Sequence, residues 1–314
     1  MLYTGMSTKK LQNPAVMEEV KYQKTLSRTI QFTGVGVHSN QQMTMEIHPA
    51  AADTGYVFRR TDLKENNIVI AAWDKVSDTR MCTRITNDSG VSIATIEHII
   101  AALAGCGIDN AIIDINGPEV PIMDGSSKEY VEEILRHGMT ELEAPRTFIK
   151  VLKPVEVRQG NNYARLLPDN GYNMDISFDF SGRLGDKKWQ MSYSPLKDDF
   201  ADLAFARTFG FYEDAEKLWA AGMSLGASLD NTVVLDKDGT AMNKQGLRAE
   251  DELIRHKTLD AIGDLALAGG VLLGKLESHN PGHNLNNLVL RELFKSQDNW
   301  CYETLVPAKA RAVV

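Results

Sequence analysis

His256 and Asp260 stand four residues apart, and Asp264 follows at the same interval. On an α-helix of 3.6 residues per turn, these three side chains lie within about 80° of one another. Side chains four apart are separated by about 5–6 Å, so His256 and Asp260 can bind one metal ion. Apolar residues occupy the opposite side of the same segment. We therefore predict a helix that buries one face and presents metal ligands on the other.

His98 is the candidate third ligand, and Glu97 directly precedes it. The run 99–105 predicts a helix that ends at glycine, with Thr95 or Ser92 near its start as the cap. Catalytic zinc usually takes three protein ligands and keeps one position open for water. A neighbouring glutamate that does not bind the metal is the usual general base. The chemistry that these residue types predict is hydrolysis.

Ordinary structural roles are the alternative for these residues. A lone histidine or aspartate on a helix is more often a surface or core residue, and a pair at this spacing also suits an ordinary hydrogen bond. Glycine at position 263, beside the ligand face, lowers helix stability by roughly 1 kcal/mol relative to alanine. Because this cost is accepted, we expect another backbone or a substrate to approach closely there. Spacing alone leaves both interpretations open.

Further sequence blocks accompany the two ligand segments between about Lys24 and about Ala308. They are 33–39 (TGVGVHS), 95–98 (TIEH), 107–110 (GIDN), 121–126 (PIMDGS), 206–211 (ARTFGF), 256–264 (HKTLDAIGD) and 282–283 (GH). In these blocks and their order the chain resembles the UDP-3-O-acyl-N-acetylglucosamine deacetylase family, the zinc hydrolases that commit Gram-negative bacteria to lipid A synthesis. The resemblance implies that the chain removes acetate from UDP-3-O-acyl-N-acetylglucosamine, leaving UDP-3-O-acyl-glucosamine.

The resemblance also implies one Zn²⁺ per chain, held by His98, His256 and Asp260. Glu97 would take a proton from water, and Thr208 would donate to the oxyanion, although Thr208 could also simply cap a turn. His283 and Asp264 would form a polar pair opposite Glu97, in which a protonated imidazole stabilises the oxyanion or protonates the departing amine. Without the resemblance, His283 is a loop histidine.

Substrate binding is expected to leave an apolar signature. The candidates for the acyl passage that the resemblance implies are Phe209, Phe211, Trp219, Met223, Leu225 and Ala227. Each could instead be an ordinary core residue. Lys257, next to a ligand, is the best-placed cation for the UDP group, and His38, Met81 and Cys82 are expected to line the same cleft.

Two alternatives to this function stay open. One is an amidohydrolase of the same fold that acts on another N-acylated sugar or amine, and the other is a zinc-stabilised binding protein without turnover. A set of two histidines and one aspartate also admits Fe(II) or Co(II) in place of zinc.

Composition agrees with a globular protein but does not decide its function. A length of 314 residues and 43% apolar residues suit about two ordinary domains. The net charge of -8 argues against a nucleic-acid-binding protein. The longest weakly polar runs are too short to span a bilayer, and we find no signal peptide, so we expect a cytoplasmic monomer. Cys82, Cys106 and Cys301 lack the spacing of a structural metal site or a disulfide framework, and we interpret them as free thiols.

The periodicity of apolar residues along the sequence predicts an α+β protein built from two similar halves. The first half should contain strands within 29–48 and at 110–116, and helices after His98 and at 128–137. The second should contain paired strands at 148–158 and 163–168, strands at 173–180 and 231–235, and helices at 195–206 and 252–268. Pro145 disfavours helix at 141–146 and predicts a boundary between domains 21–143 and 144–314, after an extension at 1–20. The resemblance implies two related layered domains packed helix face to helix face, with the active site between them.

Overall fold

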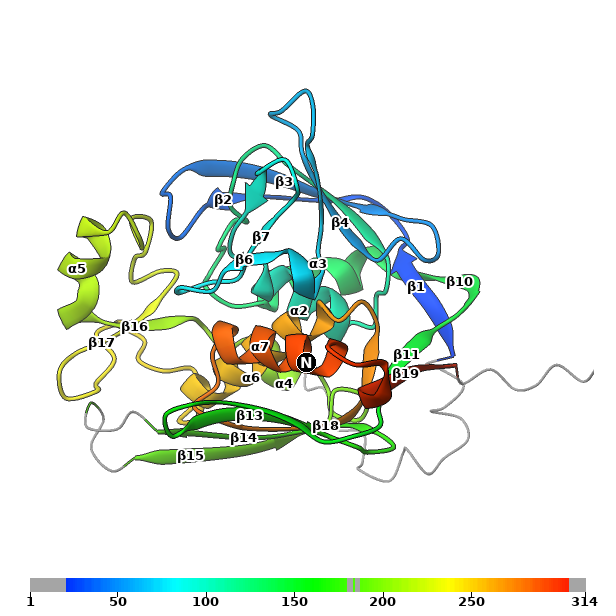
Figure 1. Ribbon diagram of the computed structural model, residues 1–314. Coiled ribbons are helices and arrows are strands. Elements are labelled where there is room, and N and C mark those ends of the chain that lie inside the picture. Colours follow the sequence, from blue (N-terminus) through cyan, green and yellow to red (C-terminus); the bar gives the residue numbers. More distant parts are fainter. Residues whose placement is uncertain (1–20, 180–182, 184–186, 305–314) are drawn as a thin grey trace, which may run out of the picture.

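The computed structural model describes residues 21–179, 183 and 187–304. The predicted extension at 1–20 and the predicted strand end at Phe180 lie outside these residues. The fold class is α+β, as expected, with mixed sheets and helices between them (Figure 1).

A five-stranded sheet forms one outer layer. Its strands are, in spatial order, β2 (Ile30–Val35), β3 (Gln42–Pro49), β9 (Ala111–Ile115), β4 (Tyr56–Arg60) and β5 (Ile68–Ile70). Alternate residues of β3, Met43, Met45 and Ile47, are buried, which is the period-two pattern of a sheet with one face on the core. The strands predicted within 29–48 and at 110–116 are thereby confirmed.

A seven-stranded sheet forms the opposite outer layer. It contains β12 (Val155–Gln159), β13 (Asn162–Leu167), β18 (Val271–His279), β11 (Thr147–Val151) and β19 (Trp300–Thr304), with β14 (Tyr172–Asp179) paired to β18 and β15 (Lys188–Tyr193) at its edge. Every second residue of β14 is buried, so this sheet also turns one face to the core. The two sheets come from opposite sides of residue 145 in the sequence.

Helices lie between the two sheets, as Figure 1 shows for α2, α3, α6 and α7. The helices are α2 (Glu97–Gly105), α3 (Lys128–His137), α4 (Ala201–Ala204), α5 (Ala215–Ala220), α6 (Glu252–Ala266) and α7 (His283–Phe294), with short 3-10 turns η2 (Trp73–Lys75), η3 (Tyr212–Asp214) and η4 (Gln297–Asn299). α2 and α6 pack against each other so closely that a Cβ at Gly263 would lie 2.1 Å from the carbonyl oxygen of Glu97. The close backbone approach predicted for Gly263 is confirmed.

Short strands complete the fold. They are β1 (Tyr22–Leu26) with β10 (Met139–Pro145), β6 (Val76–Asp78) with β7 (Arg84–Thr86) and β8 (Ser92–Ile93), and β16 (Phe209–Phe211) with β17 (Val233–Leu235). In Figure 1, α5, β16 and β17 extend to one side of the layered body. None of the helices in the described part of the chain combines the length and the apolar character needed to cross a bilayer.

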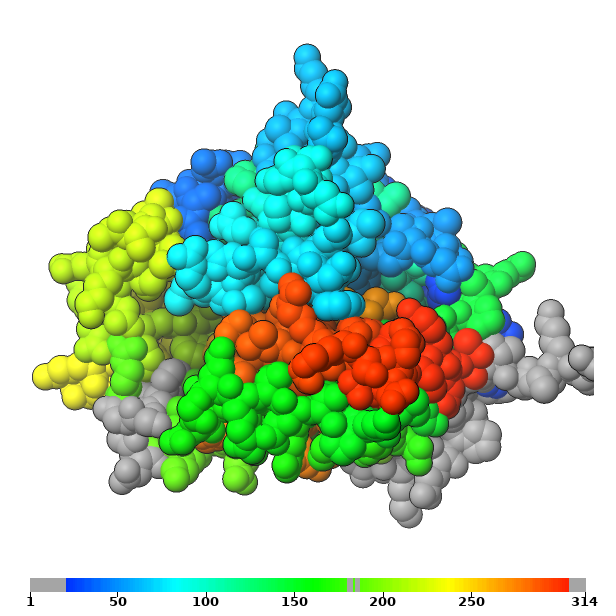
Figure 2. Space-filling model, in the orientation of Figure 1, coloured from blue at the N-terminus to red at the C-terminus, as the bar shows by residue number. Residues whose placement is uncertain are grey.

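The segment around β6 packs directly on α7. Figure 2 shows this segment (cyan) and α7 (orange) meeting on one face of the molecule. Nδ2 of Asn287 donates to the carbonyl oxygen of Trp73 at 2.8 Å, and Nη2 of Arg291 donates to that of Val76 at 3.1 Å. These bonds connect a helix from the second half of the chain to a segment from the first half.

Several predicted elements need correction. The helix predicted at 195–206 is wrong, because only α4 forms there. The carboxylate of Asp198 accepts from the backbone N–H of Ser194, and that of Asp199 accepts from the N–H of Ala201. These side chains therefore compete with the backbone hydrogen bonds that a longer helix would need. The single strand predicted at 148–158 is in fact β11 and β12, and only β12 pairs with β13.

The predicted cap of α2 is also wrong. The helix begins at Glu97 after Ile96, and no side chain caps it; Ser92 lies in β8. The predicted helices at 128–137 and 252–268 are confirmed as α3 and α6. β10 spans the predicted boundary between residues 143 and 144, and the division into two domains stays a prediction.

Candidate active site

The predicted metal-binding group is assembled from α2 and α6. His98 is in the first turn of α2, and His256 and Asp260 are one turn apart on α6. Nε2 of His98 lies 3.6 Å from Oδ1 of Asp260, and Nε2 of His256 lies 3.4 Å from the same oxygen. All three residues are buried, and their ligand atoms lie within 4.8 Å of one another. Among the described residues, this is the one group of His, Cys, Asp and Glu side chains with the geometry to hold a metal ion.

Hydrogen bonding leaves the ligand atoms of this group available. Oδ1 of Asp260 is buried and has no hydrogen-bond partner in the described part of the chain, while Oδ2 accepts from Nζ of Lys257 at 3.3 Å. Nδ1 of His256 lies 3.0 Å from the carbonyl oxygen of Ala206, and donation to that oxygen leaves the lone pair on Nε2. A buried, unpaired carboxylate oxygen is costly unless a cation satisfies it. The residues present therefore fit a bound metal ion.

The charge states of the two α6 residues agree with this fit. Burial lowers the pKa of His256 to about 4 although Asp260 is close, so the imidazole is neutral at neutral pH. Burial opposes ionisation of Asp260, but the neighbouring His256, Lys257 and His98 outweigh burial and hold the pKa of Asp260 well below its usual range. Neutral imidazole and ionised carboxylate are the forms that bind metal ions.

Glu97, His283 and Asp264 form a second buried cluster beside the metal-binding group. Nδ1 of His283 lies 2.8 Å from Oδ2 of Asp264, and Nε2 of His283 lies 3.9 Å from Oε1 of Glu97. Burial alone would lower the pKa of His283, but the charges of Asp264 and Glu97 and the bond to Asp264 raise it to about 9. Burial raises the pKa of Glu97, against the effects of His283 and His98. His283 is the first residue of α7 and not part of a loop.

Glu119, which the sequence did not single out, fixes the start of α2. Thr95 has a φ of 59°, a left-handed conformation that is rare for a β-branched residue. Its hydroxyl donates to Oε1 of Glu119 at 3.0 Å, and the backbone N–H groups of His38 and Ser39 each donate to the same carboxylate at 2.8 Å. Glu119 thereby connects the residue that turns the chain toward Glu97 with the turn between β2 and β3.

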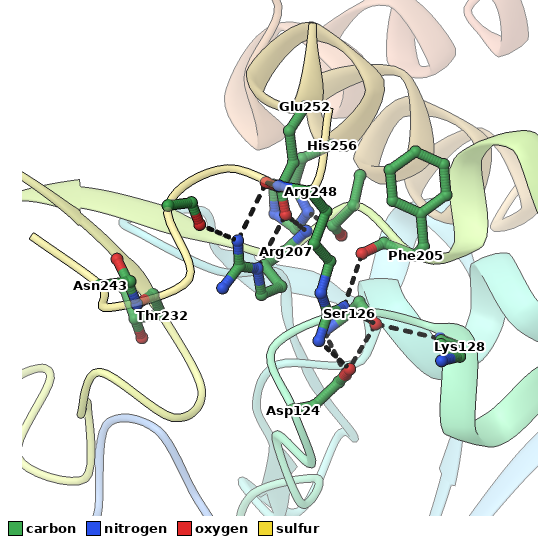
Figure 3. Close-up of polar contacts among 12 residues, drawn as sticks. Asp124, Ser126, Lys128, Phe205, Arg207, Thr232, Asn243, Arg248, Glu252 and His256 are labelled. Atoms are coloured by element: carbon green, nitrogen blue, oxygen red, sulfur yellow. Dashed lines mark hydrogen bonds and ion pairs between the residues drawn. The ribbon is translucent and has the colours of Figure 1, made fainter. Parts of the chain in front are cut away.

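An ion pair of Arg207 and Glu252 lies close to His256 (Figure 3). Nε of Arg207 lies 2.8 Å from Oε1 of Glu252, and neither side chain is exposed to solvent. Glu252 is one turn before His256 on α6, and Arg207 follows Ala206, whose carbonyl oxygen bonds to His256. The ion pair therefore holds the backbone that orients a candidate ligand.

Thr208 is held between the two halves of the chain. Its backbone N–H donates to the carbonyl oxygen of Gly125 at 2.7 Å. In Figure 3, Arg248 reaches from the segment before α6 to Asp124 and Phe205. Nη2 of Arg248 lies 2.8 Å from Oδ2 of Asp124, and Nη1 donates to the carbonyl oxygen of Phe205, also at 2.8 Å. The turn at 121–126, a motif with no chemistry of its own, thus supports Thr208.

A cavity of about 290 Å³ opens beside the two clusters. Glu97, His98 and Thr208 contribute to its wall. The rest of the wall is largely apolar and includes Val37, Ile122, Leu218, Leu229, Val234 and Met242, none of which was among the predicted substrate residues. One cavity thus joins groups able to hydrolyse an amide to an apolar slot suited to a hydrocarbon chain.

The predicted substrate residues divide into two sets. Those that line the cavity are His38, Met81, Phe209, Phe211, Trp219 and Ala227. Those that do not are Lys257, Cys82, Met223 and Leu225.

For three residues of the second set, the structure shows other contacts or surroundings. Lys257 bonds to Asp260 and lies over the ring of Phe209, with Nζ 5.3 Å from the ring centroid. Cys82 is buried, and burial together with the charge of Glu97 raises the pKa of its thiol to about 12. Leu225 is exposed, and its backbone N–H donates to the carbonyl oxygen of His38 at 3.2 Å. All three cysteines are free thiols, as predicted.

Comparison with known proteins gives consistent matches. A family model described as UDP-3-O-acyl N-acetylglycosamine deacetylase matches residues 23–295. A UDP-3-O-acyl-N-acetylglucosamine deacetylase of Actinobacillus succinogenes is 44% identical over 285 residues, which cover 90% of this chain and 93% of the relative. Proteins of the same name from Aliivibrio fischeri and Vibrio cholerae are each 42% identical, with the same coverage of 90% and 93%. The matched range includes every residue of the candidate site.

Proposed function

The chain belongs to the UDP-3-O-acyl N-acetylglycosamine deacetylase family, and we propose from this premise that it hydrolyses the N-acetyl group of UDP-3-O-acyl-N-acetylglucosamine. The products are UDP-3-O-acyl-glucosamine and acetate, and the ester at the 3-oxygen stays intact. This reaction is the committed step of lipid A synthesis. We further propose that the chain acts as a monomer, since one chain supplies every group of the proposed site, and that it works in the cytoplasm.

The observation that carries the proposal is the buried cluster of His98, His256 and Asp260, which lies beside Glu97 at the wall of an apolar cavity. A metal-binding group alone would suit many proteins, and an apolar cavity alone would suit any lipid binder. Their contact suits a substrate that carries an amide and a hydrocarbon chain on one sugar.

We assign His98, His256 and Asp260 as the ligands of a zinc ion. When bound, zinc with an open position supplies Lewis-acid activation of water and of an amide carbonyl. Lys257 supports this set by holding the second oxygen of Asp260 and adds positive charge on the side where the UDP group is expected.

Glu97 acts as the general base that takes a proton from the attacking water. Its buried position raises its pKa toward the working pH, which favours proton transfer in both directions. Attack on the amide carbon forms a tetrahedral oxyanion, to which the hydroxyl of Thr208 donates.

His283 acts as the acid that completes the reaction. Its Nε2 proton passes to the sugar nitrogen as the carbon–nitrogen bond breaks, and acetate and the free amine leave. Asp264 accepts from Nδ1 and keeps the imidazole charged and correctly oriented.

The proposal is tested with purified protein that is stripped by a chelator and reloaded with zinc, Fe(II) or Co(II). Mass spectrometry should show loss of acetate from UDP-3-O-acyl-N-acetylglucosamine with the 3-O-acyl ester retained. His98→Ala, His256→Ala and Asp260→Ala should each bind far less than one metal ion per chain and show no turnover. Glu97→Ala should keep its metal and lose about 10²–10⁴ in rate.

His137→Ala is a matched control, because the hydrogen bond and the ion pair of His137 in the described part of the chain both join it to Glu133 on α3, away from the site. It should keep both metal and activity. Full metal retention by any of the three ligand variants would remove that residue from the set. A wild-type protein that binds the substrate without releasing acetate would show that the chain is a binding protein.

A further inference from the structure

Thr83 lies between the proposed base and the proposed acid pair, a position that no sequence motif indicates. Its backbone N–H donates to Oε2 of Glu97 at 2.9 Å, and its hydroxyl donates to Oδ1 of Asp264 at 2.5 Å. The residue is 1% exposed, so water does not compete for either bond. One residue therefore contacts both carboxylates that face His283.

The bond from Thr83 completes the hydrogen bonding of Asp264. Oδ2 of Asp264 lies 2.8 Å from Nδ1 of His283 and accepts from Nδ2 of Asn286 at 2.9 Å. Thr83 occupies the other oxygen, Oδ1. With donors on both oxygens the carboxylate cannot rotate without losing a bond, and its orientation sets that of the His283 ring.

The backbone holds Thr83 firmly in this place. Its carbonyl oxygen accepts from the N–H of Ile96, the residue before α2, at 3.4 Å. The next residue, Arg84, begins β7, which pairs with β6 and β8. Thr83 is thus fixed to the start of α2 on one side and to a small sheet on the other.

We propose that Thr83 is a positioning residue for the deacetylation, which holds Glu97 and the Asp264–His283 pair in fixed relative positions. The inference rests on the roles proposed above for those residues. Thr83 acts through them, because it is not part of the cavity wall. Loss of its hydroxyl should therefore lower kcat and leave KM nearly unchanged.

The test compares Thr83→Val, which removes the hydroxyl at constant shape, with Thr83→Ser, which keeps it. Thr83→Val should lower kcat roughly 10- to 100-fold, the range for losing a hydrogen bond to a charged group, with KM within about twofold. Thr83→Ser should stay within about threefold of wild type. Thr83→Ala carries the same expectation as Thr83→Val and replaces it if the valine variant does not fold.

Thr86→Val, at the end of β7 three residues after Thr83, is the matched control, because the hydroxyl of Thr86 lies 2.6 Å from that of Ser77 at the surface. It should have wild-type kinetics. A double-mutant cycle with Asp264→Asn separates positioning from a general structural effect. In the Asp264→Asn background, Thr83→Val should add less than about a twofold loss, since its partner is already altered.

Three results would overturn the inference. They are wild-type kcat in both Thr83→Val and Thr83→Ala, equal losses in Thr83→Val and Thr83→Ser, and losses that multiply in the double variant. If Asp264→Asn and His283→Ala were themselves fully active, the proposed acid pair would fail together with the inference. If those two were impaired and Thr83→Val were not, only the role of Thr83 would fall.

Discussion

Gly263→Ala tests whether the contact between α2 and α6 determines the metal-binding geometry. A Cβ at this position would lie 2.1 Å from the carbonyl oxygen of Glu97 and 2.9 Å from its carbonyl carbon. Both neighbours are backbone atoms, so no side chain can rotate away. The two helices would have to separate, and each carries part of the metal-binding group.

The size of the effect follows from these distances. Close carbon–oxygen contacts lie at about 3.3–3.6 Å, so the helices must move apart by at least about 1.2 Å at Gly263. Metal–ligand distances tolerate roughly ±0.2 Å, so this shift would take His98 out of reach of an ion held by α6. Overpacking of this kind costs about 1–3 kcal/mol of stability, whereas helix propensity alone predicts a gain of roughly 1 kcal/mol for alanine.

The assay measures zinc affinity by competition with a chromogenic chelator and unfolds the metal-free protein in urea. Gly263→Ala should lose zinc affinity by at least tenfold, lose stability and lose most of its activity. Ala266→Gly, near the end of the same helix, is the control; it should cost about 1 kcal/mol without changing zinc affinity. A Gly263→Ala variant that is more stable than wild type and binds zinc equally well would refute a tight helix crossing.

Three further predictions concern other parts of the site. Activity should fall as pH rises through about 9, where His283 loses its proton, and His283→Ala should remove this limb from the pH–rate profile; an unchanged limb would assign it to another group. Glu252→Ala should lower the free energy of unfolding by about 3–5 kcal/mol in urea titrations, because it leaves the charge of Arg207 buried and unpaired, and a loss below about 1 kcal/mol would contradict that account. Trp219→Glu should raise KM about fivefold for a long-acyl substrate and leave KM for a short-acyl analogue unchanged, because Trp219 lines the cavity and is half exposed. Equal changes in KM for both substrates would argue against an acyl slot at Trp219.

The α6 pair of the metal-binding group could be predicted from the sequence because its signal is local. His256 and Asp260 lie on one helix face, and the periodicity that buries the other face of α6 is present in the sequence. The helix at 128–137 was predicted with its observed bounds for the same reason, since its apolar residues recur at helical spacing. His98 was a candidate third ligand from its residue type and its neighbour Glu97, and the family resemblance supported its combination with the α6 pair, because the spacing of distant residues does not show that they meet.

Thr83 and Glu119 could not be predicted, because their roles depend on tertiary contacts. Thr83 acts through a backbone N–H and a hydroxyl, and every segment of irregular structure offers such groups. The cavity wall is similar: Val234 and Met242 come from β17 and the loop after it, which have no motif. The wrong helix at 195–206 shows the same limit, since the bonds of Asp198 to the backbone compete with a helical pattern that is present in the sequence.

The place where the helices cross explains why the reactive groups gather there. Gly263 stands between Asp260 and Asp264 on α6, and it contacts the carbonyl oxygen of Glu97, whose neighbour is His98. The contact that requires glycine therefore also places His98 and the proposed base on α2 beside His256 and Asp260 on α6. Burial of so many ionisable side chains is unfavourable by itself. The apolar faces of the two large sheets, which enclose these helices, supply the hydrophobic stabilisation that allows such a crossing to persist.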